Sequence, residues 1–269
     1  MCVVFISSIQ HQKEGYRLIL ASNRDEFYCR PTLSANYWLE NSNIIGGRDI
    51  SLSSKGGTWL ALNIKGKICT LLNIFQLSNQ INAQSRGRLV ENYIKSDVKA
   101  PIYVESLKDV YNGFKLIMIE INMSSIETYL LTNDDSSNHP VMTNIPDGVK
   151  GYGNEAFQKV SEGEKRFNTI VKSYGKNTTK LKLIEELLDL LKWNEQHVLD
   201  ENLIQHAPKY SGIDYKYFSS VFVEIPHLKY GTRTHTIILI DHNGDIEYNE
   251  WTKVDEDWKH QCFNTKLEF

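Results

Sequence analysis

Cys2 has the strongest case for chemistry, because it is the second residue of the chain and its side chain is small. Met1 is normally removed from such a start, and the chain would then begin with a cysteine whose α-amine lies close to its own sulfur. That amine has a reference pKa of about 7.7–8.0, so it can accept the thiol proton near neutrality. Nucleophile and base would then belong to one residue. An inert cysteine at the start of a strand is the alternative interpretation.

Four strongly polar residues form the run Asn23-Arg24-Asp25-Glu26, directly after an apolar segment. Because unpaired polar groups are costly to bury, we expect these side chains on a surface or in a polar cleft. Arg24 would favour a nearby thiolate, and Asp25 would hold an ammonium group or a polar part of a ligand. The alternative is an ordinary loop with one Arg–Asp pair.

Whether Cys2 and this polar run are neighbours depends on how two predicted strands pair. Residues 2–9 and 16–21 are apolar and are joined by a polar turn at 11–15. If these strands are antiparallel, the end of the second lies beside the start of the first. The sequence therefore predicts that Cys2 and a turn at 23–26 are neighbours.

Three further polar residues stand at the ends of predicted strands. Asn73 ends a buried strand, Asn154 closes a short glycine-containing segment, and Arg233 precedes an apolar strand. A side-chain amide in such a place can donate to a developing oxyanion, and an arginine can bind a carboxylate or phosphate. Turn formation by the asparagines and an exposed loop around Arg233 are the alternatives.

The order of the remaining elements predicts a layered α+β fold. Strands, then helices, then strands follow along the chain, without the alternation of a βαβ series. No linker is long enough to divide the chain, so we expect a single domain over residues 1–269. The predicted strands are 58–64, 67–75, 114–121, 126–132, 219–224, 235–241 and 246–251, and the predicted helices are 86–97, 101–111, 155–173 and 180–193, with a loop at 133–150.

Charge and hydropathy exclude several classes of protein. The net charge is −3 and the pI is near 6.3, which argues against a nucleic-acid binder with a basic face. No apolar stretch approaches the roughly 18–20 residues of a transmembrane helix, and no secretory segment opens the chain. We therefore expect a cytoplasmic or organelle-surface protein. The four cysteines lack metal-like spacing, and no metal site is predicted.

Several segments together resemble the transport and Golgi organization protein 2 family, also called NRDE proteins after residues 23–26. The resemblance runs nearly end to end. It is carried by Met1-Cys2, Tyr16–Ala21, Asn23–Phe27, Arg30-Pro31, Gly56–Leu60, Tyr111–Phe114, Tyr230–Thr234 and Thr236–Leu239.

This resemblance implies a four-layer αββα sandwich similar to that of N-terminal nucleophile hydrolases. It also implies intracellular haem trafficking, in which haem is a transient cargo rather than a tightly bound cofactor. The protein would pass haem from an organelle, such as a mitochondrion or a lysosome-related organelle, to haem-acceptor proteins in the cytosol. The family is further linked to acyl-coenzyme A and lipid handling, with Asn23, Arg24, Asp25 and Glu26 as the implicated ligand-binding residues.

A more distant likeness concerns cysteine-type N-terminal nucleophile hydrolases that cleave bile-salt and penicillin amides. Their Met-Cys start, arginine, aspartate and two asparagines resemble Met1-Cys2, Arg24, Asp25, Asn73 and Asn154, with Arg233 as a looser match for their last arginine. Their arginine and aspartate are spaced more widely than the adjacent pair found here, so the likeness does not assign the role of Arg24.

Three functions follow as expectations. The first is haem trafficking on a hydrolase-like fold. The second is an amide or thioester hydrolase in which Cys2 attacks, its α-amine takes the proton, Asn73 and Asn154 stabilise the oxyanion, and Asp25 holds the amine. The third is a non-catalytic acyl-coenzyme A or lipid binder. Whether the hydrolase-like site is catalytic is left open by the sequence.

Overall fold

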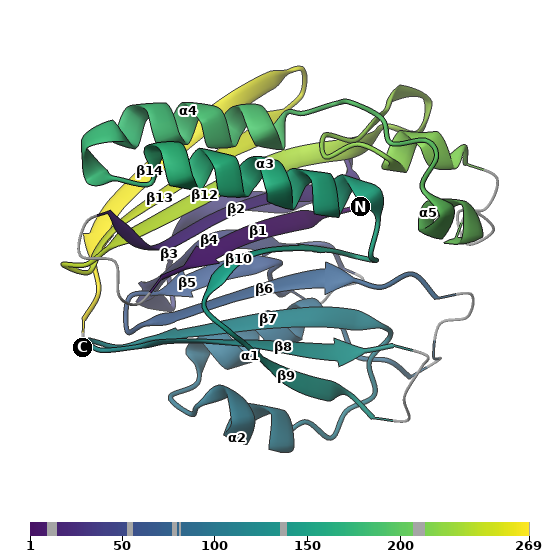
Figure 1. The fold of residues 1–269 in the computed structure, drawn as a ribbon. Helices are drawn as coiled ribbons and strands as arrows, with labels where there is room; N and C mark the ends of the chain where they lie inside the picture. Colours follow the sequence, from purple (N-terminus) through teal and green to yellow (C-terminus); the bar gives the residue numbers. More distant parts are fainter. Residues whose placement is uncertain are drawn as a thin grey trace. The chain divides into compact units, whose positions relative to one another are not determined.

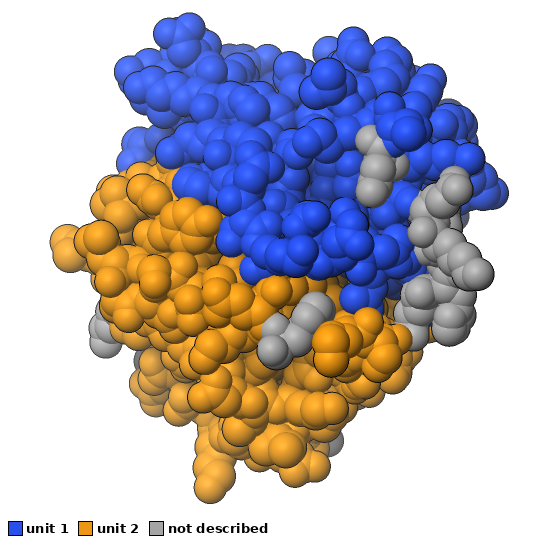
Figure 2. Space-filling model, turned by 90° about the vertical axis from the view of Figure 1, so that its left-hand side faces the viewer, with its two compact units in different colours: residues 1–29, 147–266 blue, residues 30–146, 267–269 orange. Residues whose placement is uncertain are grey.

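The protein is described here by a computed structural model, which covers residues 1–9, 15–52, 56–76, 80, 82–134, 139–206 and 213–268. The chain divides into two compact units, which Figure 2 shows in separate colours. Unit 1 consists of Met1–Cys29 and Asp147–Lys266, and unit 2 of Arg30–Pro146 and Leu267–Phe269. Most of the predicted turn at 11–15 falls outside the described residues.

Unit 1 is built on an antiparallel sheet in which the first two strands of the chain are neighbouring interior strands. The strand order is β10-β1-β2-β12-β13-β14, and the short β11 pairs with β12 (Figure 1). Runs of β-branched and aliphatic residues favour β1, β2 and β12. Their bounds are β1 Val3–Ser8, β2 Tyr16–Phe27, β10 Gly148–Gly153, β11 Glu224–Ile225, β12 Tyr230–Asp241, β13 Asp245–Val254 and β14 Asp257–Lys266.

Two long helices cover one face of this sheet, α3 (Gln158–Tyr174) and α4 (Lys180–Leu191) (Figure 1). Alternate strand residues meet the helices' apolar stripes in one core, as the two periodicities require. That core includes Phe5, Ile19, Phe167, Leu187 and Ile237, among others. Shorter helical segments in unit 1 are η1 Asn177–Thr179, α5 Glu201–His206, η3 Tyr215–Phe218 and η4 Pro226–Leu228.

Unit 2 is a second antiparallel sheet whose seven strands follow chain order from β3 to β9. Helix α1 packs on this sheet through Leu89 and Tyr93, which share a core with Cys69 and Leu116. The bounds are β3 Thr32–Trp38, β4 Asn41–Asp49, β5 Leu60–Asn63, β6 Lys67–Asn73, β7 Phe114–Ile121, β8 Ile126–Asn133, β9 Val141–Ile145, α1 Gly87–Lys95 and α2 Ala100–Glu105.

The expected α+β class is therefore confirmed. Each unit contributes one antiparallel sheet and one set of helices, which are the components that an αββα fold requires.

Several predicted boundaries are wrong. The run 23–26 is not a turn, because β2 continues through it to Phe27 and pairs with β12 on its far side. The predicted loop at 133–150 contains β9 and the first half of β10, and the predicted strand at 219–224 reduces to β11. Strands β3, β4 and β14 were not predicted, and the helix expected at 101–111 ends at Glu105.

Candidate functional site

Antiparallel pairing of β1 with β2 brings the start of the chain beside the polar run. Val3 pairs with Asn23 in this register, so the residues before Val3 lie along the residues after Asn23. The backbone N–H of Asp25 donates to Cys2 Sγ at 3.3 Å. The predicted proximity of Cys2 to the polar run is confirmed.

The amino-terminal ammonium of Met1 is held inside unit 1. Its nitrogen lies 2.7 Å from Oδ2 of Asp25, in an ion pair whose two groups are both 0% exposed. It also donates to the Tyr230 hydroxyl at 3.0 Å. The second carboxylate oxygen of Asp25 accepts a hydrogen bond from the Thr232 hydroxyl at 2.6 Å. Asp25 thus holds an ammonium as predicted, but that ammonium belongs to Met1 rather than to Cys2.

The Cys2 thiol is half-buried, and it is protonated at neutral pH because its pKa is raised. Burial raises its pKa above the ordinary value, and the carboxylate of Asp25 raises it further. The amino-terminal charge, the Asp25 N–H and Arg24 lower this pKa, but burial dominates. The thiol therefore needs a nearby base to become a nucleophile.

Lys159, in the first turn of α3, belongs to this site although the sequence analysis did not select it. Its side chain is 1% exposed. Its Nζ donates to the carbonyl of Met1 at 3.1 Å and to the carbonyl of Ser220 at 2.9 Å. Burial lowers the pKa of Lys159 to about 8, while the carboxylate of Asp25 and Cys2 act in the opposite direction. A buried ammonium is therefore aimed at the peptide carbonyl that precedes Cys2.

Asn23 has a structural role in the same region. Its Nδ2 donates to the carbonyls of Leu191 at 2.7 Å and Val221 at 3.1 Å. Its Oδ1 lies 2.6 Å from Nδ1 of His235, so this ring nitrogen is the donor. Burial lowers the pKa of His235 to about 3, which keeps the ring neutral. A role of Asn23 in ligand binding stays a prediction.

The charged residues near the run are mostly buried rather than on a surface or in an open cleft. Arg24 is 6% exposed, and its Nη2 lies 3.8 Å from Oε2 of the partly exposed Glu26. Arg233 is 7% exposed and donates to the carbonyl of Phe27 at 3.0 Å. The β2–β12 register shifts between Thr232 and Thr234, which sets Arg233 apart from the regular pairing.

The two predicted oxyanion donors lie in different units. Asn154 is 3% exposed and directly follows Gly153, the residue that pairs with Val3. This register places Asn154 at the Cys2 end of β1. Asn73 ends β6 in unit 2, where it is exposed. The oxyanion roles of both asparagines stay predictions.

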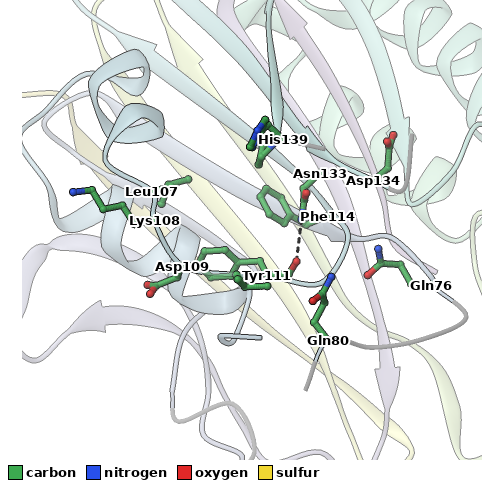
Figure 3. A pocket seen from close by; sticks show the side chains of 12 residues that line it. Gln76, Gln80, Leu107, Lys108, Asp109, Tyr111, Phe114, Asn133, Asp134 and His139 are labelled. Atoms are coloured by element: carbon green, nitrogen blue, oxygen red, sulfur yellow. Dashed lines mark hydrogen bonds between the residues drawn. The ribbon is translucent and has the colours of Figure 1, made fainter. Parts of the chain in front are cut away.

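A separate pocket of about 580 Å³ lies in unit 2 (Figure 3). Phe114 and Tyr111 form its aromatic wall, and Asn133 donates to the Tyr111 carbonyl at 3.0 Å across it. The described residues that line it include none of the predicted site residues. Over the same described part of the chain, no group of three or more His, Cys, Asp or Glu residues is arranged to hold a metal ion.

Comparison with known proteins identifies the relatives of this chain. The family model described as Transport and Golgi organisation 2 matches residues 1–255. The chain belongs to this family. The mouse Transport and Golgi organization 2 homolog is 31% identical over 98% of both chains, and the Drosophila melanogaster Transport and Golgi organization protein 2 is 33% identical over 100% of this chain and 98% of its own length.

A solved structure places this Transport and Golgi organisation 2 family member in a fold class. The C2A mutant of conjugated bile acid hydrolase from Clostridium perfringens matches with a TM-score of 0.52, at 9% identity, over 100% of this chain and 97% of the hydrolase chain. The expected likeness to the cysteine N-terminal nucleophile hydrolase fold is therefore confirmed. No helix among the described residues of the family member is long and apolar enough to cross a membrane.

Proposed function

We propose that the protein is a hydrolase of amide or thioester bonds that uses Cys2 as its nucleophile once Met1 has been removed. One observation carries this proposal: Asp25 holds an amino-terminal nitrogen at 2.7 Å and donates its own N–H to Cys2 Sγ at 3.3 Å. The buried residue Asp25 therefore supplies both a carboxylate that can hold an amine and a backbone N–H that can donate to a thiolate. The bile acid hydrolase of similar fold also has a cysteine at position 2.

The roles follow from the ordinary chemistry of the groups. After removal of Met1, the α-amine of Cys2 has a reference pKa of about 7.7–8.0 and can take the thiol proton. The Asp25 N–H stabilises the thiolate as it forms. Lys159 Nζ now donates to the carbonyl oxygen of Met1, so it can donate in the same way to the oxyanion of a substrate. Asn154 is proposed to stabilise the oxyanion as well.

Turnover of simple acyl amides and acyl thioesters tests this function. Intact mass first establishes which preparation begins at Cys2. We expect that preparation to release the leaving group, while Cys2→Ala and a chain with an uncleaved amino-terminal tag release none. Equal turnover by Cys2→Ala would contradict the proposal. Cys262→Ala, which changes an exposed cysteine, is the matched control and should turn over as the parent does.

The second candidate is haem trafficking, which the resemblance of the sequence to NRDE proteins implies; the printed names of the relatives add only transport and Golgi organization. The protein would bind haem as cargo at an organelle, such as a mitochondrion or lysosome-related organelle, and release it to cytosolic acceptor proteins. Such a carrier needs only a weak site, because it must release its cargo. Acyl-coenzyme A or a lipid is the alternative cargo.

A haem titration tests this second candidate independently of catalysis. We expect a shifted Soret band at micromolar protein, and transfer of the bound haem to an apo-acceptor protein. The same shift in Cys2→Ala would show that carriage does not need the nucleophile. An unchanged Soret band would contradict haem carriage, and the titration is then repeated with acyl-coenzyme A.

A further inference from the structure

Met1 is bound by unit 1 through both of its backbone polar groups. The residue is 2% exposed, so its side chain is buried as well. Asp25 and Tyr230 hold its ammonium, and Lys159 holds its carbonyl oxygen. A negative group thus faces the nitrogen and a positive group faces the oxygen, which is the charge pattern that complements an α-aminoacyl group.

We propose that the place of Met1 is the acyl subsite of the enzyme and that it takes an α-aminoacyl group, with the ammonium on Asp25 and Tyr230 and the acyl oxygen on Lys159. This inference rests on the proposed hydrolase and names its substrate class. The subsite is available once Met1 has been removed.

The position of the acyl carbon relative to the nucleophile supports this subsite. The carbonyl carbon of Met1 is bonded to the nitrogen of Cys2, so it lies beside both the α-nitrogen and the sulfur of that residue. A substrate whose ammonium and acyl oxygen take the places of those of Met1 would hold its acyl carbon near this position, at van der Waals distance from the free α-amine and within reach of the sulfur. Such alignment is what lowers the entropic cost of an attack.

Lys159 stays in place when Met1 leaves, because its second hydrogen bond goes to the carbonyl of Ser220 at 2.9 Å. Its remaining hydrogens then point to the acyl oxygen of a substrate instead of the Met1 carbonyl. Burial strengthens such a charged hydrogen bond to a developing oxyanion. Lys159 is thereby assigned the role of a catalytic residue at this subsite.

The reaction conserves atoms and protons. The thiol proton of Cys2 passes to the α-amine, a bond forms between Sγ and the acyl carbon, and the bond to the leaving amine or thiol breaks. The leaving group takes the proton from the α-amine. Water then attacks the thioester, the amino acid leaves as its carboxylic acid, and the thiol of Cys2 is restored.

This subsite changes the role expected of Asp25. A carboxylate that held the α-amine of Cys2 would serve every substrate equally, whereas one that holds the ammonium of the substrate serves only α-amino substrates. The two roles therefore predict different responses to the same substitution.

A matched pair of substrates tests the inference on the unaltered protein. L-Methionyl and 4-(methylthio)butanoyl amides of 7-amino-4-methylcoumarin differ only in the α-amine. For the preparation that begins at Cys2, we expect kcat/KM to favour the α-amino amide by at least about tenfold, with no release by Cys2→Ala. Equal kcat/KM values for the two amides would overturn the α-aminoacyl subsite but not the proposed hydrolase activity. No Cys2-dependent release from either amide would overturn both proposals.

Variants at the subsite provide a second test. Tyr230→Phe removes only a hydroxyl, and we expect it to lower kcat/KM for the α-amino amide several-fold and to leave the des-amino amide unchanged. Asp25→Asn should lower the α-amino value by about 100-fold, and Lys159→Met should lower kcat for both amides. Equal losses on the two amides in both Tyr230→Phe and Asp25→Asn would overturn the assignment of the ammonium.

Discussion

The residues of the polar run have separate roles at the atomic scale. Asn23 ties β2 to the carbonyls of Leu191 and Val221 and orients His235. Asp25 instead meets the amino terminus and the Cys2 thiol. A block substitution of the whole run would therefore combine a folding defect with any loss of function, and single substitutions separate the two.

Replacing Asn23 with alanine should lower the free energy of unfolding by roughly 3 kcal/mol, because two buried carbonyls and the N–H of His235 lose their partner. Urea denaturation measures this change. The matched control is Asn194→Ala at an exposed position, which should stay within about 0.5 kcal/mol of the parent. Equal stability of the two variants would contradict a structural role for Asn23.

His235 should make the protein less stable as the pH falls below the ordinary histidine range. Its pKa is about 3 in the folded protein and about 6.5 when unfolded, so the unfolded chain binds the extra proton between these values. The stability from the neutral ring is complete above pH ~6.5 and is lost as the pH falls through ~3, by about 1.4 kcal/mol per pH unit.

Comparison of the parent with His235→Asn isolates this effect, because asparagine can still donate to Asn23 but does not titrate. We expect unfolding curves at pH 7 and pH 5 to show a loss about 2 kcal/mol larger in the parent. Parallel losses in the two proteins would show that His235 is not the group responsible.

Sequence reasoning could predict the neighbourhood of Cys2 and Asp25, since Cys2 lies at the start of one predicted strand and Asp25 follows the other, at 16–21. It could not predict the partners that come from distant segments. Tyr230 and Thr232 reach Asp25 only through the β2–β12 pairing. One feature of the sequence indicates that Lys159 is buried: it lies four residues before Gly163 and eight before Phe167, on the buried stripe of α3.

At the scale of elements, the packing of α3 on β1 controls where Lys159 lies. The ring of Phe5 fits against Gly163, where an added Cβ would lie 2.4 Å from Cζ of Phe5. Gly163 thus lets the helix and the sheet approach closely at this point. Neither element can shift without moving Lys159 relative to the start of β1.

Gly163→Ala should therefore destabilise the protein by about 1–3 kcal/mol, even though alanine is the better helix former by about 1 kcal/mol. Thermal unfolding measures the loss. Ser161→Ala, an exposed position on the same helix, should be neutral or stabilising. The double variant with Phe5→Leu should recover part of the loss, and a stabilised Gly163→Ala would contradict the close packing.

The predicted elements differ in how well their sequences marked them. Helices α3 and α4 and strands β7 and β8 have clear apolar periodicity and were predicted to within a few residues. Strand β9 is largely exposed and β10 contains three glycines, so neither has the alternation of a half-buried strand. β14 alternates partly exposed and exposed residues with no buried face, so it was missed for the same reason.

At the scale of the whole molecule, unit 1 is assembled from two segments of the chain, Met1–Cys29 and Asp147–Lys266, with residues 30–146 of unit 2 between them. The site inherits this arrangement: Met1, Cys2 and Asp25 come from the first segment, and Lys159 and Tyr230 come from the second. The sequence has no local signal for these two compact units, because sheet pairing over such separations is set by tertiary packing. The single domain over residues 1–269 stays a prediction.

Trapping of the acyl-enzyme tests the central claim most directly. The preparation that begins at Cys2 is mixed with an acyl thioester, quenched in acid within one turnover and examined by intact mass and peptide mapping. The account predicts one acyl group on Cys2, absent when Met1 is retained and absent in Cys2→Ala. A chain that begins at Cys2 and neither gains an acyl group there nor consumes the thioester would contradict it.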